Sequence, residues 1–121
     1  MSVDGTIEEN RPISEHEAAI VEWMIRHDPN GRLLHLTSSI PQLRVVGRCG
    51  CGCASVDFEC GGQGATGRPI ANAEAQTPRG SVGLILWGRE DAITGLEVYE
   101  LSAAEPNPLP AVSELVPWLT T

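Results

Sequence analysis

Three cysteines in the segment "GRCGCGCAS" have the residue type and spacing best suited to chemistry in this sequence. Cys49, Cys51 and Cys53 alternate with glycine, and Cys60 follows seven residues later. Thiolates bind zinc and Cu(I), and a close pair of thiols can also form a disulfide. The first question is therefore whether this segment binds a metal, undergoes redox chemistry or packs as small thiols.

The spacing of these cysteines is tighter than in most zinc sites. Paired zinc ligands are usually separated by two to four residues, because a turn must bring the sulfurs together. Along a straight strand, residues i and i+2 lie about 6.6 Å apart on one face, so the chain would have to curl around an ion. Gly50 and Gly52 permit such curling. The segment can thus form a three-thiolate site for zinc or copper.

His35 is the first candidate for a fourth ligand. Cys60 follows the two-residue alternation of Val56 and Phe58, which directs it toward the core and away from the turn. His35 belongs to the segment "RLLHLTS", which can reach the turn through tertiary folding. The predicted metal ligands are therefore Cys49, Cys51, Cys53 and His35.

Two other interpretations of the cysteine segment stay open. Buried cysteine behaves as a small hydrophobic residue that suits Gly-rich packing, and the spacing slightly favours this structural role. The alternative functional class is a thiol-based redox protein or sensor that uses Cys49, Cys51 and Cys53, since a Cys-Gly-Cys pair can close a strained, labile disulfide. Only Arg44 and Arg48 lie nearby to lower a thiol pKa.

Composition narrows the class of partner. The chain has 121 residues, a formal net charge of −8 and no lysine. Such a surface repels nucleic acid and anionic lipid, and no apolar run approaches the length of a membrane span. The start "MSVDGTIEEN" is acidic and polar, unlike a signal peptide. We therefore expect a cytoplasmic protein that binds neither nucleic acid nor membranes. The class of binding partner that remains is another protein.

The N-terminal part predicts helices. Ser14 and Glu17 form a capping-box pattern, and Ile20, Trp23 and Met24 recur at helical spacing until Asp28-Pro29. His16 then falls on an exposed turn of this helix and His27 at its C-terminal boundary. A second, shorter helix is expected in "RLLHLTS" before Pro41.

From Leu43 onward the pattern alternates with a period of two, which predicts two β-hairpins. The first joins "LRVVGR" and "ASVDFEC" through the cysteine segment, and the second joins "SVGLILWG" and "AITGLEVYEL". In the second hairpin, the inward-facing positions are expected to include Leu84, Leu86, Leu96 and Val98. The expected fold is α+β: an amphipathic N-terminal helix and a short second helix packed on one antiparallel sheet of about four strands. One domain should span 1–121, with a polar lead-in (1–11), a Gly/Pro/Ala-rich loop (61–80) and a proline-rich strut (105–121). The other sheet face could be solvated or could form a homodimer.

No motif in the sequence supports catalysis. The segment "GQGATG" matches G-x-G-x-x-G, but Pro69 interrupts the helix that a dinucleotide site requires. A lysine for a P-loop and the serine-hydrolase and zinc-protease motifs are absent. We therefore assign no catalytic or cofactor-binding residues, and the sequence indicates a non-enzymatic binding module with the cysteines as its candidate metal site.

The segments "VVGRCGCGCASVDFE", "GLEVYELS" and "PLP" resemble a family of small uncharacterised bacterial proteins. In those proteins a C-x-C-G-C hairpin precedes a Ser/Thr-Val-Asp strand and a late Gly-Leu-Glu-Val-Tyr strand. The resemblance covers roughly residues 40–60 and 82–110, and Cys60 has no matching position in it. It implies one compact domain in which the cysteine hairpin belongs to the fold, and it implies no activity.

The metal hypothesis predicts that protein purified without added metal carries about one zinc or copper ion per chain. Elemental analysis and native mass spectrometry measure this, and Cys49→Ser should abolish it because one thiolate is lost. Metal-free protein with four freely reactive thiols would contradict the hypothesis.

Overall fold

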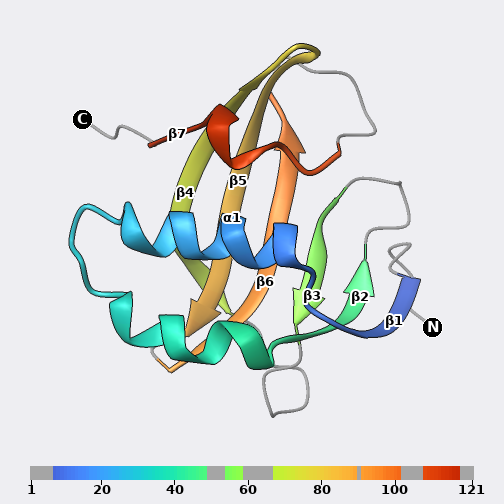
Figure 1. Ribbon diagram of the computed structural model, residues 1–121, viewed down its shortest axis with the longest axis vertical. Helices are drawn as coiled ribbons and strands as arrows, with labels where there is room; N and C mark the ends of the chain where they lie inside the picture. The colour runs from blue at the N-terminus through green and yellow to red at the C-terminus, as the bar shows by residue number, and fades with distance from the viewer. Residues whose placement is uncertain (1–6, 49–53, 59–66, 90, 102–107, 118–121) are drawn as a thin grey trace.

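The chain forms one antiparallel sheet of seven strands with its helices on one face (Figure 1). The computed structural model describes residues 7–48, 54–58, 67–89, 91–101 and 108–117. The elements in chain order are β1 (Ile7–Pro12), α1 (Glu15–Arg26), the 3-10 helix η1 (Leu34–Gln42), β2 (Arg44–Arg48), β3 (Val56–Phe58), β4 (Arg68–Thr77), β5 (Gly80–Arg89), β6 (Ala92–Glu100), the 3-10 helix η2 (Val112–Glu114) and β7 (Leu115–Pro117). Across the sheet the strand order is β1-β2-β3-β6-β5-β4-β7, and all neighbours are antiparallel.

Helix α1 begins at the predicted capping box. The Ser14 hydroxyl accepts a hydrogen bond from the Glu17 backbone N–H at 3.0 Å, and the Glu17 carboxylate accepts one from the Ser14 backbone N–H at 2.9 Å. These two bonds satisfy backbone donors that the first helical turn leaves without partners. The apolar stripe of the helix is buried, with Ile20, Val21 and Ile25 at 0% exposure. The predicted amphipathic helix is confirmed.

Glu17 also ties the helix to strand β1. Its carboxylate accepts hydrogen bonds from Arg11 Nη1 at 3.0 Å and Nη2 at 2.8 Å, although Glu17 is only 6% exposed. Burial by itself raises the pKa of Glu17, but the bonds from Arg11 and from Ser14 outweigh it and the pKa lies below its usual value. The ionised carboxylate therefore stabilises the junction between β1 and α1.

The core lies between the helices and the inner face of the sheet. Strands β4, β5 and β6 form a meander, and α1 packs over β4. On β4 the inward residues are Ala71, Ala73 and Ala75, whose small side chains let the helix come close. Leucine, isoleucine and valine side chains from β5 and β6 fill the remaining space; they are Val82, Leu84, Leu86, Ile93, Leu96 and Val98. The predicted inward positions on the second hairpin are confirmed.

The sheet has seven strands, so the prediction of about four was wrong. Both predicted hairpins are present as β2–β3 and β5–β6. The three further strands lie in segments where no strand was predicted. Strand β1 lies in the lead-in, β4 in the Gly/Pro/Ala-rich segment and β7 in the strut. Strand β4 was missed because its buried positions are alanines, which have low strand propensity.

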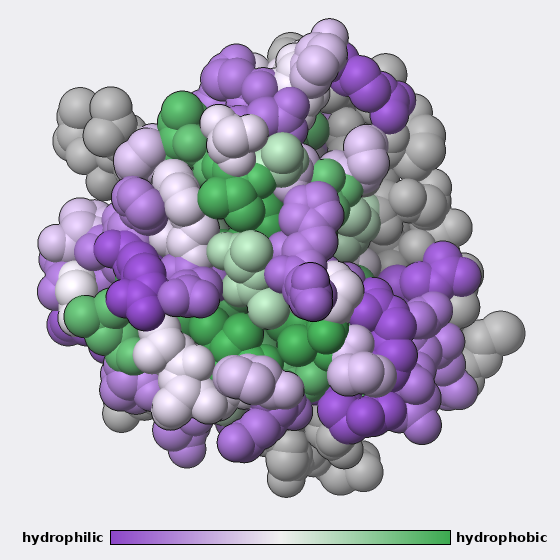
Figure 2. Space-filling view, viewed as in Figure 1, coloured by the Kyte–Doolittle hydropathy of each residue, from purple (hydrophilic) through white to green (hydrophobic). Residues whose placement is uncertain are grey.

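The second helix and the tail complete the helical face. Element η1 is a 3-10 helix that runs through Pro41 and buries Leu36 and Ile40, so the expected second helix is confirmed in a longer form. The tail returns over the same side, where His16 Nε2 contacts the Pro110 carbonyl oxygen at 2.7 Å. Figure 2 shows this face, with apolar side chains at its centre and polar side chains around them.

Replacing Glu17 with glutamine tests the junction between β1 and α1. Near pH 7, Glu17→Gln should reduce the free energy of unfolding by about 1 kcal/mol, because the charge-assisted bonds to Arg11 are lost. The folded-state pKa is lowered, so this stabilisation exists above the unfolded pKa of about 4.3 and disappears as pH falls through the folded value. The difference from wild type should therefore shrink near pH 3.

Denaturant titrations near pH 7 and about pH 3 measure this difference. Glu22→Gln is the control, because Glu22 is exposed on the same helix and pairs with Arg26 at the surface. An equal loss for Glu17→Gln at both pH values would contradict the assigned role.

Candidate functional site

The cysteines of the predicted metal site lie outside the described residues. This applies to Cys49, Cys51, Cys53 and Cys60 alike. On the C-terminal side of the cysteine segment, the Ser55 hydroxyl donates to the Val98 carbonyl at 3.1 Å and accepts from the Val98 N–H at 2.8 Å, which fastens the start of β3 to β6. The metal and redox hypotheses stay predictions.

His35, the predicted fourth ligand, lies on η1 and is exposed. In Figure 1, η1 is at the end of the sheet where β2 begins, and β2 runs from there toward Arg48. His35 lines a pocket together with arginine side chains. Within the part of the chain that the structure describes, no group of three His, Cys, Asp or Glu residues could hold a metal ion.

The other two histidines take part in local packing. The His27 ring stacks on Trp23 with 3.9 Å between centroids, and its Nδ1 lies 2.9 Å from the Trp23 carbonyl oxygen. His16 contacts the tail at Pro110. The prediction of His27 as a boundary residue is confirmed, because it caps the C-terminal end of α1.

The candidate functional site is the outer sheet face, the side of the sheet that faces away from α1 and η1. Strand pairing arranges its side chains in three rows across the sheet. The rows are Asp57-Gly95-Trp87-Pro69, then Glu97-Ile85-Asn72, then Tyr99-Gly83-Glu74-Val116. These rows combine two aromatic rings, three carboxylates and the apolar side chains of Pro69, Ile85 and Val116, and they contain no positive charge.

The Tyr99 ring lies directly against the sheet because Gly83 leaves room for it. A Cβ atom at Gly83 would fall 2.2 Å from Tyr99 Cζ and 2.5 Å from the hydroxyl oxygen, which is closer than real atoms approach. Any other residue at position 83 would therefore displace the ring. This contact places the Tyr99 ring directly over the backbone of β5, and the side chain stays partly exposed.

Trp87 is held in place by a carboxylate on the neighbouring strand. Its indole Nε1 donates a hydrogen bond to Glu97 Oε1 at 3.0 Å. Both side chains are half-buried, and Gly95 lies opposite Trp87 in the strand register. The bond fixes the ring orientation and satisfies the indole donor, so the ring can present apolar area at little cost in side-chain entropy.

The carboxylates give the outer sheet face a negative potential. Partial burial raises the pKa of Tyr99, and the charges of Glu97 and Glu74 raise it further. A negative charge on the phenolate is thus opposed by two carboxylates that lie close to it. The same field favours a positive charge placed over this face.

The two-residue alternation of the sequence contains a signal for this site. Leu84 and Leu86 were predicted to face inward, so Ile85 and Trp87 had to face outward by strand alternation. The same alternation places Glu97 and Tyr99 outward beside Val98. Only the register between strands, which the sequence does not specify, shows that these residues form adjacent rows.

Tyr99 is the single tyrosine of the chain, so its ionisation can be followed by tyrosinate absorbance. We expect a midpoint above that of free tyrosine, and a lower midpoint in Glu97→Gln and in Glu74→Gln because each removes a nearby negative charge. Glu22→Gln, which changes a carboxylate on α1, should leave the midpoint unchanged. A wild-type midpoint at or below that of free tyrosine would contradict this electrostatic description.

Among the described residues, no helix is long and apolar enough to cross a membrane. Comparisons of the chain with protein-family models, with curated proteins and with solved structures give no match.

Proposed function

We propose that this chain is a non-enzymatic binding module whose outer sheet face binds a basic segment of a partner protein. One observation carries the proposal: Trp87 and Tyr99 lie partly exposed between the carboxylates of Asp57, Glu74 and Glu97. Tryptophan and tyrosine are enriched among the residues that dominate binding energy at protein interfaces.

The charge of the face supports a cationic partner. An arginine or lysine side chain over Trp87 or Tyr99 gains a cation–π interaction and meets the carboxylates at the same time. Complementary charge also raises the rate of association and discriminates against acidic partners. A chain with net charge −8 would attract a basic protein over a range set by the ionic strength.

The same charges disfavour a second copy as the occupant. In a two-fold dimer the same surface lies on both sides of the interface, so the acidic face of one copy would meet the acidic face of the other. Like charges placed opposite one another across an interface cost binding free energy. A homodimer through the outer sheet face therefore ranks below a basic partner.

A synthetic peptide of alternating arginine and alanine serves as the probe, with a glutamate–alanine peptide of equal length as its negative counterpart. Isothermal titration calorimetry should detect only the arginine peptide, with affinity falling as salt rises. Trp87→Ala should weaken binding by about 30-fold, as for a central interface aromatic. Glu97→Gln should weaken it as well, because it removes a negative charge and leaves only a neutral acceptor for the Trp87 indole.

Glu22→Gln is the matched control, since it removes one carboxylate from α1 on the other side of the sheet. Unchanged binding in Glu22→Gln supports the proposal. If Glu22→Gln and Glu97→Gln weakened binding equally, net charge alone would explain the attraction and the proposal would fail. A concentration-dependent dimer lost in Trp87→Ala, measured by sedimentation, would assign the face to a second copy instead.

A further inference from the structure

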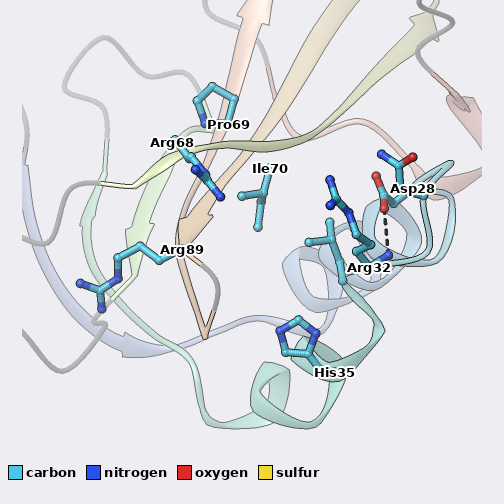
Figure 3. A pocket seen from close by; sticks show the side chains of 9 residues that line it. Asp28, Arg32, His35, Arg68, Pro69, Ile70 and Arg89 are labelled. Carbon is cyan, nitrogen blue, oxygen red and sulfur yellow. Dashed lines mark hydrogen bonds between the residues drawn. The ribbon is translucent and has the colours of Figure 1, made fainter.

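A separate pocket of about 680 Å³ lies between the end of α1, the start of η1 and the adjoining ends of β4 and β5 (Figure 3). Three of the eight arginines of the chain line it, namely Arg32, Arg68 and Arg89, and His35 joins them. Among the described residues, the pocket shares only Pro69 with the rows of the outer sheet face and none of their aromatic rings or carboxylates.

The arrangement of these side chains is shown in Figure 3. Arg32 and Arg68 extend from opposite sides toward Ile70, and His35 approaches from η1, whereas Arg89 extends away from the other two arginines. Two guanidinium groups thus border the same space, and the side chain of Ile70 forms its apolar floor. Such planar groups offer paired N–H donors that match the oxygens of phosphate or carboxylate.

The described ion pairs leave these two guanidinium groups available. Arg11, Arg26 and Arg48 each pair with a carboxylate, but neither Arg32 nor Arg68 makes an ion pair with any described residue. Asp28 is the one carboxylate among the described lining residues. Its Oδ2 accepts a hydrogen bond from the Arg32 backbone N–H at 3.2 Å, so it shapes the turn that presents Arg32.

Glycines set the shape of the pocket at three places. Gly31 has a φ of +64°, which closes the turn after α1 immediately before Arg32. A Cβ at Gly88 would lie 2.6 Å from Ile70 Cδ1, so Ile70 packs directly on the backbone of β5. Likewise, a Cβ at Gly67 would lie 2.3 Å from Thr94 Oγ1, which holds the start of β4 close to β6 just before Arg68. The backbone on which Arg32 and Arg68 lie is therefore held in place by the tight turn and by close packing.

The geometry points to a binding site for a small organic phosphate, with the phosphate between Arg32 and Arg68 and the organic group over Ile70. Two facing guanidinium groups match the double charge of a phosphomonoester better than a single carboxylate charge. The pocket volume lies within the range of small-molecule sites, about 300 to 1,000 Å³. This site is independent of the proposed binding of a basic protein.

Phenyl phosphate is the probe for the test, and titration calorimetry on the full chain is the measurement. We expect one binding event per chain, weakened by about 10-fold or more in Arg32→Met and in Arg68→Met, since each loses charge-assisted hydrogen bonds. Methionine keeps an unbranched side chain, and near-ultraviolet circular dichroism checks that each variant is folded. Arg79→Met is the matched control, because Arg79 lies in the turn at the other end of β4, and it should bind as wild type does.

Two further probes separate the parts of the proposal. Phenol should not bind measurably, and inorganic phosphate should bind more weakly than phenyl phosphate because it makes no contact with Ile70. Equal affinity for the two phosphates would overturn the role of the apolar floor. An equal loss of affinity in Arg79→Met and Arg68→Met, or no binding of phenyl phosphate at all, would overturn the site.

Discussion

The structure depends on one constraint: a 12-residue α-helix and the 3-10 helix η1 must together cover the inner face of a seven-stranded sheet. Helix α1 can do so because β4 beneath it presents Ala71, Ala73 and Ala75, so that the helix lies close to the backbone of the sheet. Larger side chains from β5 and β6 then close the gap beside it. Glu17 fixes the position of the start of α1. Its carboxylate pairs with Arg11 on β1 and also caps the first turn of the helix.

The described helices all pack on one face of the sheet, and none of them covers the opposite face. On the outer sheet face, aromatic rings lie among carboxylates. Arginine side chains lie instead around the pocket at the ends of β4 and β5. Although the net charge is −8, the chain has two surfaces of opposite charge, the negative outer sheet face and the positive pocket. Ligands of opposite charge could occupy them at the same time, and each would be repelled from the other's surface.

The sequence predicted the parts of the fold that strong local patterns encode. The capping box at Ser14 and the alternation of Leu84 and Leu86 belong to this class. Strand β4 escaped prediction because alternating alanines carry little hydrophobic signal, although their burial is complete at Ala73 and Ala75. The outer sheet face and the arginine pocket depend on strand register and on contacts distant in sequence, such as Arg32 near Arg68, and no local pattern encodes these.

The two outermost strands decide how this sheet can meet other chains. Strand β7 has three residues and ends at Pro117, which has no N–H to offer, and β1 ends at Pro12 after the charged residues Glu8, Glu9 and Arg11. Short, charged or proline-terminated edges resist the addition of a further strand. Both described edges of the sheet therefore resist edge-to-edge pairing, which is the first step in the growth of many fibrils. Association with other molecules is then directed to the sheet face and the pocket.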